Sequence, residues 1–396
     1  MRNYGKLTIK GSTQFEAKLS NVLEDIALDI ELLINKDLYE AVILIGGYGR
    51  GEGGVVVVEG EELPHNNFDF VVISKDITQK DKDYLTFKCQ RIFDDHTKAL
   101  GILVEFTVIS SFKLNTCDPL VITYDMKYGH KLICGNAVSL VENKNFELEN
   151  IPSWDVRNLI VNRGTLLVIN DLMLNKDNLE RKEKKIIIKH WIKAIIGYGD
   201  ALLFYLGDYN YSYVEKQKRM KKQNAVSDKF KNIYNEAMNF RFEPEYEDYL
   251  SLDFKEHQSF LKNELSKIHT KCEELALNKV QINSLSYINK AVNETLNNNL
   301  GLKSILKKVY FLTKKVPTIS SMSFIENIKY RMLGIKGMMP ILFPYVAYDM
   351  KNEVFDKILK DFFKLDIKNK DAYKISYLKY WKTYVNTNFV KEDFGL

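Results

Sequence analysis

Residues 43–53 read ILIGGYGRGEG, and this stretch decides how the N-terminal part of the chain is organised. The run 41–45 predicts a buried strand, because a short apolar segment that ends in glycines is typical of a strand feeding a turn. Glycine lets backbone N–H groups approach an anion closely and adopts positive φ, so phosphate is the natural ligand of such a turn. A short helix starting there would add the positive end of its dipole. The turn is neither a P-loop, since no GK[ST] follows, nor the dinucleotide fingerprint.

Acidic and amide side chains on two further strands would supply the chemistry that accompanies such a turn. Residues 65–73 read HNNFDFVVI, so Asn67 and Asp69 share one face of the predicted strand. Glu105 lies inside the β-branched strand predicted at 101–110, where an acid is costly if it is buried without a partner. A shared metal ion is one such partner, and pairing with Lys or Arg at the rim of the sheet is the alternative.

The individual residues of this pattern also have simpler explanations. The glycines could form a tight turn without a ligand, and Asn67 could cap the start of its strand, since Asn-Asn pairs favour turns. Arg50 could contact a phosphate through charge-assisted hydrogen bonds, cap the following helix or pair with Glu52. The sequence leaves these alternatives open.

The order of strand, GGYGRGE turn, xDxD-type strand and third acid resembles the polymerase-beta-type nucleotidyltransferase superfamily. The turn is especially similar to that of the uridylyltransferases and adenylyltransferases that modify nitrogen-signalling proteins. The resemblance covers roughly residues 40–135, and the stretch TYDMKYGHKLICG resembles the closing segment of that domain. It implies an N-terminal polymerase-beta-like domain with a mixed sheet.

The resemblance also implies a role for each matching position. Gly46 and Gly47 match the pair that holds the triphosphate. Asp69 matches the second metal-binding aspartate, and Glu105 matches the third acid, which helps to ligate the catalytic metal and to activate the attacking hydroxyl. Asn67 stands where the first aspartate is expected, so its amide oxygen would ligate a metal without contributing charge. The sequence departs from the family pattern in two further ways. The spacing between the turn and the acids is longer than usual, and the third acid is Glu instead of the commoner Asp.

These matches imply a Mg²⁺- or Mn²⁺-dependent nucleotidyltransferase. It would move an NMP group from a nucleoside triphosphate, such as ATP, to a hydroxyl on a protein, a small molecule or RNA. Such chemistry needs the triphosphate charge to be neutralised, usually by Mg²⁺ held on carboxylates. The loss of one carboxylate leaves a second hypothesis, a catalytically impaired nucleotide-binding pseudoenzyme acting as a sensor or interaction module. A third is a defence- or toxin-type nucleotidyltransferase, in which the basic run 216–222 would contact nucleic acid.

The chain as a whole predicts an α+β protein. We expect a nucleotidyltransferase-like domain at 1–150, a helical domain at 151–290 and a helical C-terminal region at 291–396, because apolar residues recur at helical spacing almost throughout the later part. Within the first domain we expect helices at 13–35 and 78–100.

Shorter strand-like pieces complete the predicted first domain. We expect a hairpin at 54–64 around Gly60, and strands at 68–74, 117–125 and 130–135.

A candidate acceptor pocket lies in the helical part. Polar side chains there cluster near Gly197, Gly199 and Gly207, and in this superfamily a helical second domain often completes the acceptor site. The candidate residues are Lys193, Asp200, Tyr209 and Lys216.

Composition bears on the partners of the protein, its compartment and the presence of membrane segments. The net charge of +5 permits phosphate-bearing partners but does not indicate nucleic-acid binding. The four cysteines form no CxxC pair, which favours a reducing, cytoplasmic compartment over a zinc finger or a disulfide framework. We expect no signal peptide and no membrane segment, since the apolar stretch 338–347 is short and contains two prolines.

Overall fold

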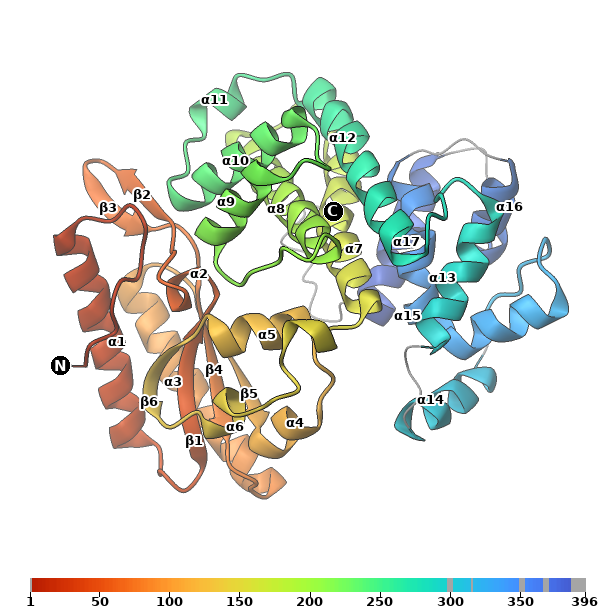
Figure 1. The fold of residues 1–396 in the computed structure, drawn as a ribbon. Helices are drawn as coiled ribbons and strands as arrows, with labels where there is room; N and C mark the ends of the chain where they lie inside the picture. Colours follow the sequence, from red (N-terminus) through yellow and green to blue (C-terminus); the bar gives the residue numbers. More distant parts are fainter. Residues whose placement is uncertain (1, 298–301, 315, 349–352, 366–369, 386–396) are drawn as a thin grey trace. The chain divides into compact units, whose positions relative to one another are not determined.

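The computed structural model describes residues 2–297, 302–314, 316–348, 353–365 and 370–385. Within these ranges the protein is α+β, with a small mixed sheet near the N-terminus and a mainly helical remainder (Figure 1). The predicted fold class is confirmed at this level.

The chain forms two compact units, and the first is discontinuous in sequence. It combines Met1–Ile151 with Tyr209–Glu245, and the second unit combines Pro152–Asp208 with Tyr246–Leu396. Residues 209–245, which we expected within a helical domain, are therefore counted with the sheet. The expected division into a nucleotidyltransferase-like domain at 1–150, a helical domain at 151–290 and a helical region at 291–396 stays a prediction.

The first unit is built on a four-stranded sheet in the order β5-β4-β1-β6. Its strands are β1 (Tyr39–Ile45), β4 (Phe68–Ser74), β5 (Val104–Ser110) and β6 (Lys131–Gly135). β4 and β5 run parallel, whereas β1 is antiparallel to both β4 and β6. The predicted hairpin is present as β2 (Val55–Val58) and β3 (Glu61–Pro64).

Helices accompany this sheet. They are α1 (Thr13–Leu33), α2 (Gly46–Gly49), α3 (Gln79–Leu100), α4 (Ser111–Thr116), α5 (Val121–Tyr128), α6 (Val138–Val141), the 3₁₀ turn η1 (Leu148–Asn150), α9 (Tyr213–Lys222) and α10 (Asp228–Phe242). The Ser12 hydroxyl accepts a hydrogen bond from the Phe15 N–H, which makes Ser12 the N-cap of α1 as the sequence suggested.

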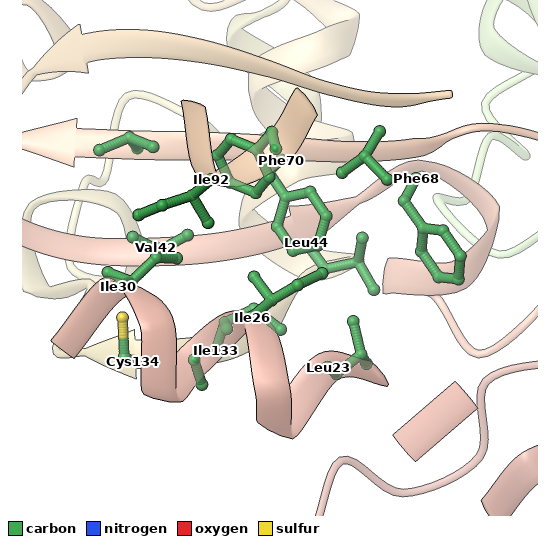
Figure 2. Packing of buried hydrophobic residues seen from close by; sticks show 14 of the residues in the cluster. Leu23, Ile26, Ile30, Val42, Leu44, Phe68, Phe70, Ile92, Ile133 and Cys134 are labelled. Atoms are coloured by element: carbon green, nitrogen blue, oxygen red, sulfur yellow. The ribbon is translucent and has the colours of Figure 1, made fainter. Parts of the chain in front are cut away.

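Both faces of the sheet are buried, which explains why its strands read as nearly continuous apolar runs. On one face, Val42 and Leu44 of β1 pack with Phe68 and Phe70 of β4 against α1 and α3 (Figures 1 and 2). On the other face, alternate residues of the same strands pack against α4, α5 and α6, a cluster that includes Ala41, Ile43, Val71, Ile73, Leu114, Met126 and Leu140.

One predicted strand is wrong. Residues 117–125 were expected to be extended because Val121, Ile122 and Thr123 are β-branched, but 121–128 form α5. The Leu120 N–H donates to the Thr123 hydroxyl at 2.8 Å, which supports the first turn of the helix. Met126 then packs into the sheet core, so tertiary burial outweighs local strand propensity.

The second unit contains helices joined by loops, and no strand among its described residues. Its elements are α7 (Ser153–Met173), α8 (Arg181–Tyr205), α11 (Glu247–Leu250), α12 (Phe254–Ala276), α13 (Leu285–Asn297), α14 (Leu302–Leu312), α15 (Phe324–Ala347), α16 (Glu353–Phe363), α17 (Lys370–Tyr380) and the π-helical turn η2 (Trp381–Val385). Across the described residues, none of the helices combines the length and apolar character that crossing a bilayer requires.

Candidate active site

The glycine turn begins directly where β1 ends. Gly46 has a φ of +70°, a conformation that glycine adopts at little cost. A Cβ atom placed on Gly46 would lie 2.8 Å from Oδ2 of Asp69, so the Asp69 carboxylate is packed against the turn. The short spacing leaves no room for a larger residue at position 46 unless Asp69 moves.

The strand register brings the predicted acids together. Asp69 of β4 is the partner of Ile45 in β1 and of Glu105 in β5. Adjacent strands lie about 4.8 Å apart, so these two carboxylates project from neighbouring positions. The Asn67 amide nitrogen donates to Oε2 of Glu105 at 3.4 Å. The sheet therefore gathers all three residues of the predicted metal set, which lie far apart in sequence.

These three side chains are open to solvent to different degrees. Asn67 and Glu105 are exposed, whereas Asp69 is half-buried. Phe68 and Phe70, the alternate residues of β4, are buried in the core beneath α1 and α3. Strand alternation thus orients Asp69 away from the apolar residues on either side of it in β4, and Asn67 directly precedes the strand.

This donor set fits a single divalent cation. Mg²⁺ typically takes one or two carboxylates and completes its coordination with waters and substrate phosphates. Asp69 and Glu105 supply two carboxylates, and Asn67 can add an amide oxygen. No group of three or more His, Cys, Asp or Glu residues suited to a metal is found in the part of the chain that the structure describes. The residues therefore do not provide the third acid of a two-metal arrangement.

Arg50 pairs with Asp125, a partner that the sequence did not indicate. Its Nη2 lies 2.6 Å from Oδ2 of Asp125 in α5, and its guanidinium stacks on the Tyr213 ring at 4.5 Å. Burial alone would lower the pKa of Arg50, but Tyr213 and the Asp125 carboxylate together raise it above its usual value. Arg50 thus fastens the turn to α5 through its Nη2, while its Nε and Nη1 are buried without a hydrogen-bond partner, and a direct phosphate contact stays a prediction.

Glu52 connects the turn to α9, a link that the sequence did not reveal. The Ser212 hydroxyl donates to the Glu52 carboxylate, and the Tyr213 N–H donates to its Oε2 at 2.7 Å. Glu52 is buried, and it satisfies backbone donors that the first turn of α9 leaves without helical partners. Nothing in the local sequence around Glu52 signals a partner that is 160 residues away.

The four residues of the candidate acceptor pocket do not all belong to one unit. Tyr209 and Lys216 belong to the first unit, where the Tyr209 hydroxyl donates to Asp125 at 2.9 Å. Lys216 is fully buried, with its Nζ 4.5 Å from the centre of the Tyr213 ring. Lys193, which is exposed, and Asp200, which is buried, both lie on α8 of the second unit. Their joint role in acceptor binding stays a prediction.

The basic run 216–222 forms most of α9. Lys216 and Met220 are buried on its inner side, while Lys218, Lys221 and Lys222 are exposed. Two of the seven residues of the run are therefore buried, and its first lysine is not available to a nucleic-acid partner.

Comparison with known proteins adds no family assignment. No protein-family model, no curated protein and no solved structure matches the chain.

Gly46→Ala should impair metal binding as well as stability. The left-handed backbone at this position should cost an alanine about 1–2 kcal/mol of unfolding free energy. Its Cβ should also displace the Asp69 carboxylate, so Mn²⁺ affinity measured by calorimetry should fall. The matched control is Gly60→Ala, because Gly60 has a φ of +84° with no atom within 4 Å of its Cβ position. Equal Mn²⁺ affinity in both variants would contradict the assignment of Asp69 as a ligand.

Proposed function

We propose that the protein is a Mg²⁺-dependent nucleotidyltransferase that uses a nucleoside triphosphate and a hydroxyl acceptor. The observation that supports it most directly is the packing of the Asp69 carboxylate against Gly46, in register with Glu105. A glycine turn, which we expect to receive phosphate, thus adjoins two carboxylates. Polyphosphate chemistry requires this combination, because it proceeds by positioning and charge neutralisation.

Each residue of the site has a part in the proposed reaction. The backbone of Gly46 and Gly47 would receive the polyphosphate, and Asp69, Glu105 and Asn67 would hold the cation. Bound Mg²⁺ neutralises phosphate charge and so stabilises the transition state. The acceptor oxygen forms a bond to the α-phosphorus while the bond from that phosphorus to the bridging oxygen breaks, and pyrophosphate leaves with the electron pair. The exposed Glu105 carboxylate would take the proton of the acceptor hydroxyl.

A second candidate function is a nucleotide-binding pseudoenzyme. It is favoured by the Asn67 amide, which donates to Glu105 where a catalytic carboxylate would add negative charge. Such a protein would keep the turn and bind nucleotide as a sensor or interaction module without transferring it.

Transfer of label from α-³²P-labelled ATP, GTP, CTP or UTP separates these functions. The protein is incubated with each nucleotide in Mg²⁺, in Mn²⁺ or in EDTA, and pyrophosphate release is measured together with label on protein, RNA or small-molecule acceptors. Metal-dependent release that is absent from an Asp69→Ala preparation supports the transferase. Nucleotide binding without release in any condition supports the pseudoenzyme and refutes the transferase.

Asn67→Asp should tighten metal binding. A carboxylate about 4 Å from a doubly charged ion contributes about 2 kcal/mol in a water-like dielectric, or about thirtyfold in affinity. We therefore expect a Mn²⁺ dissociation constant about thirtyfold lower than that of the wild type, and faster transfer at limiting Mg²⁺. An unchanged dissociation constant would show that position 67 does not face the cation. Transfer by Asn67→Asp alone, with an inactive wild type, would identify the natural protein as the pseudoenzyme.

A further inference from the structure

A second arginine lies beside the glycine turn. Arg241, near the end of α10, places its Nη2 3.1 Å from the position that a Cβ atom would occupy on Gly47. Its guanidinium stacks on the Tyr213 ring, with 3.9 Å between the guanidinium carbon and the ring centre. Arg241 belongs to the segment Tyr209–Glu245, which packs with the first unit although it is far from the glycine turn in sequence.

The guanidinium of Arg241 is only partly satisfied by the described residues. Among the described residues it forms no ion pair, and its Nε is buried without a hydrogen-bond partner. Arg50, which contacts the same tyrosine ring, pairs with Asp125 through its Nη2, and its own Nε and Nη1 are buried without a hydrogen-bond partner. A buried guanidinium nitrogen without an acceptor costs stability, and an anion bound at this guanidinium would offset that cost by supplying an acceptor and a counter-charge.

The surrounding contacts hold Arg241 in place. The Arg241 carbonyl oxygen lies 2.5 Å from the position that a Cβ on Gly54 would occupy, so its backbone is packed against the chain that leaves the turn. The backbone of Tyr213, whose ring contacts the guanidinium, is anchored by the hydrogen bond from its N–H to Glu52. Arg241 is therefore oriented before any ligand arrives, which reduces the entropy lost on binding.

We propose that Arg241 is a phosphate-binding residue that clamps the polyphosphate of the substrate onto Gly47, with Tyr213 as its positioning residue. The planar guanidinium can donate two parallel hydrogen bonds to one phosphate group, which a lysine cannot do. The inference rests on the proposed function for the identity of the ligand, but it assigns the cationic role to Arg241, whereas the sequence pointed to Arg50.

Binding of inorganic tripolyphosphate tests the inference without any transfer step. Calorimetric titration in Mg²⁺ compares wild type, Arg241→Met, Arg241→Lys and Arg91→Met. Charge-assisted hydrogen bonds make us expect about tenfold to hundredfold weaker binding in Arg241→Met. Arg91 is the matched control, since it is an exposed arginine of α3 near the ring of Phe87, and its variant should bind within about twofold of wild type.

The outcomes distinguish this inference from the proposed function. Binding within about twofold of wild type in Arg241→Met overturns the inference, and so does a wild type that does not bind at millimolar tripolyphosphate. If Arg241→Met does not fold, Arg241→Lys decides, because loss of the bidentate contact should still weaken binding about threefold or more. Tripolyphosphate binding that is weakened by Arg241→Met, in a protein whose wild type never transfers label, supports the phosphate site. That outcome rejects the proposed transferase function and leaves the role of Arg241 intact.

Discussion

Asp69→Ala should lower the rate of nucleotidyl transfer by about 10³-fold while the protein stays folded. A metal ion contributes several kcal/mol of charge stabilisation in such reactions, and about 1.4 kcal/mol corresponds to a tenfold change in rate. Asp69 lies between Gly46 and Glu105, so its removal separates the phosphate turn from the remaining carboxylate. Because Asp69 is only half-buried, we expect the unfolding free energy to change by about 1 kcal/mol or less.

Two further variants make this measurement specific. Asp69→Asn keeps the size of the side chain and removes its charge, so its transfer rate should fall nearly as far. Asp94→Ala removes an exposed acid from α3 of the same unit and should transfer at the wild-type rate. A transfer rate for Asp69→Ala within about threefold of wild type would exclude Asp69 from the reaction.

The core of this site could be predicted because its information is local. The apolar run before Gly46 is enough to place the turn after a strand, and the alternation of 67–73 is enough to orient Asp69 opposite Phe68 and Phe70. The strand itself begins at Phe68, so Asn67 directly precedes it, and its contact with Glu105 is what connects it to the acids. The pairing of Asp69 with Glu105 required one additional step, the assumption that their strands are neighbours. The parallel register of β4 and β5 supplies that step.

The partners of Arg50 and Glu52 could not be predicted because they depend on contacts between distant segments. Asp125, the partner of Arg50, lies on α5, a helix whose β-branched residues led us to expect a strand. The contact of Glu52 with the start of α9 leaves no periodic signal in either segment. Arg241 was missed for the same reason, since a single arginine in a helix becomes informative only when its neighbours are known.

Arg157→Met should lower the unfolding free energy by about 3–5 kcal/mol, the largest loss of stability that we expect. Arg157 of α7 is almost completely buried and makes a bidentate pair with Glu273 of α12, at 2.6 and 3.0 Å. Its Nη1 also donates to Glu294 of α13 at 3.0 Å. Methionine would fill much of the space but leave Glu273 buried without its cation, which is the costly way to break a buried pair.

The cost of this substitution should depend on pH. Burial by itself would raise the pKa of Glu273, but Arg157, with a contribution from His269, lowers it to about 2 from an ordinary value of 4.5. In the wild type the stability from this pair is therefore complete above pH 4.5 and is lost as the pH falls toward 2. In Arg157→Met, burial without the guanidinium should raise the pKa of Glu273 above 4.5, so the variant loses stability as the pH rises. The difference between the two proteins should thus be largest near neutral pH and shrink on acidification.

Urea unfolding of wild type and variant between pH 3.5 and 7.5 measures this difference. The matched control is Arg181→Met, because Arg181 pairs with Glu247 at an exposed position and such pairs contribute less than about 1 kcal/mol. Adding Glu273→Leu to Arg157→Met should recover part of the lost stability, since it removes the stranded carboxylate. A loss that is the same at every pH and is not relieved by Glu273→Leu would mean that Arg157 stabilises the helices by packing alone, because a cavity does not titrate.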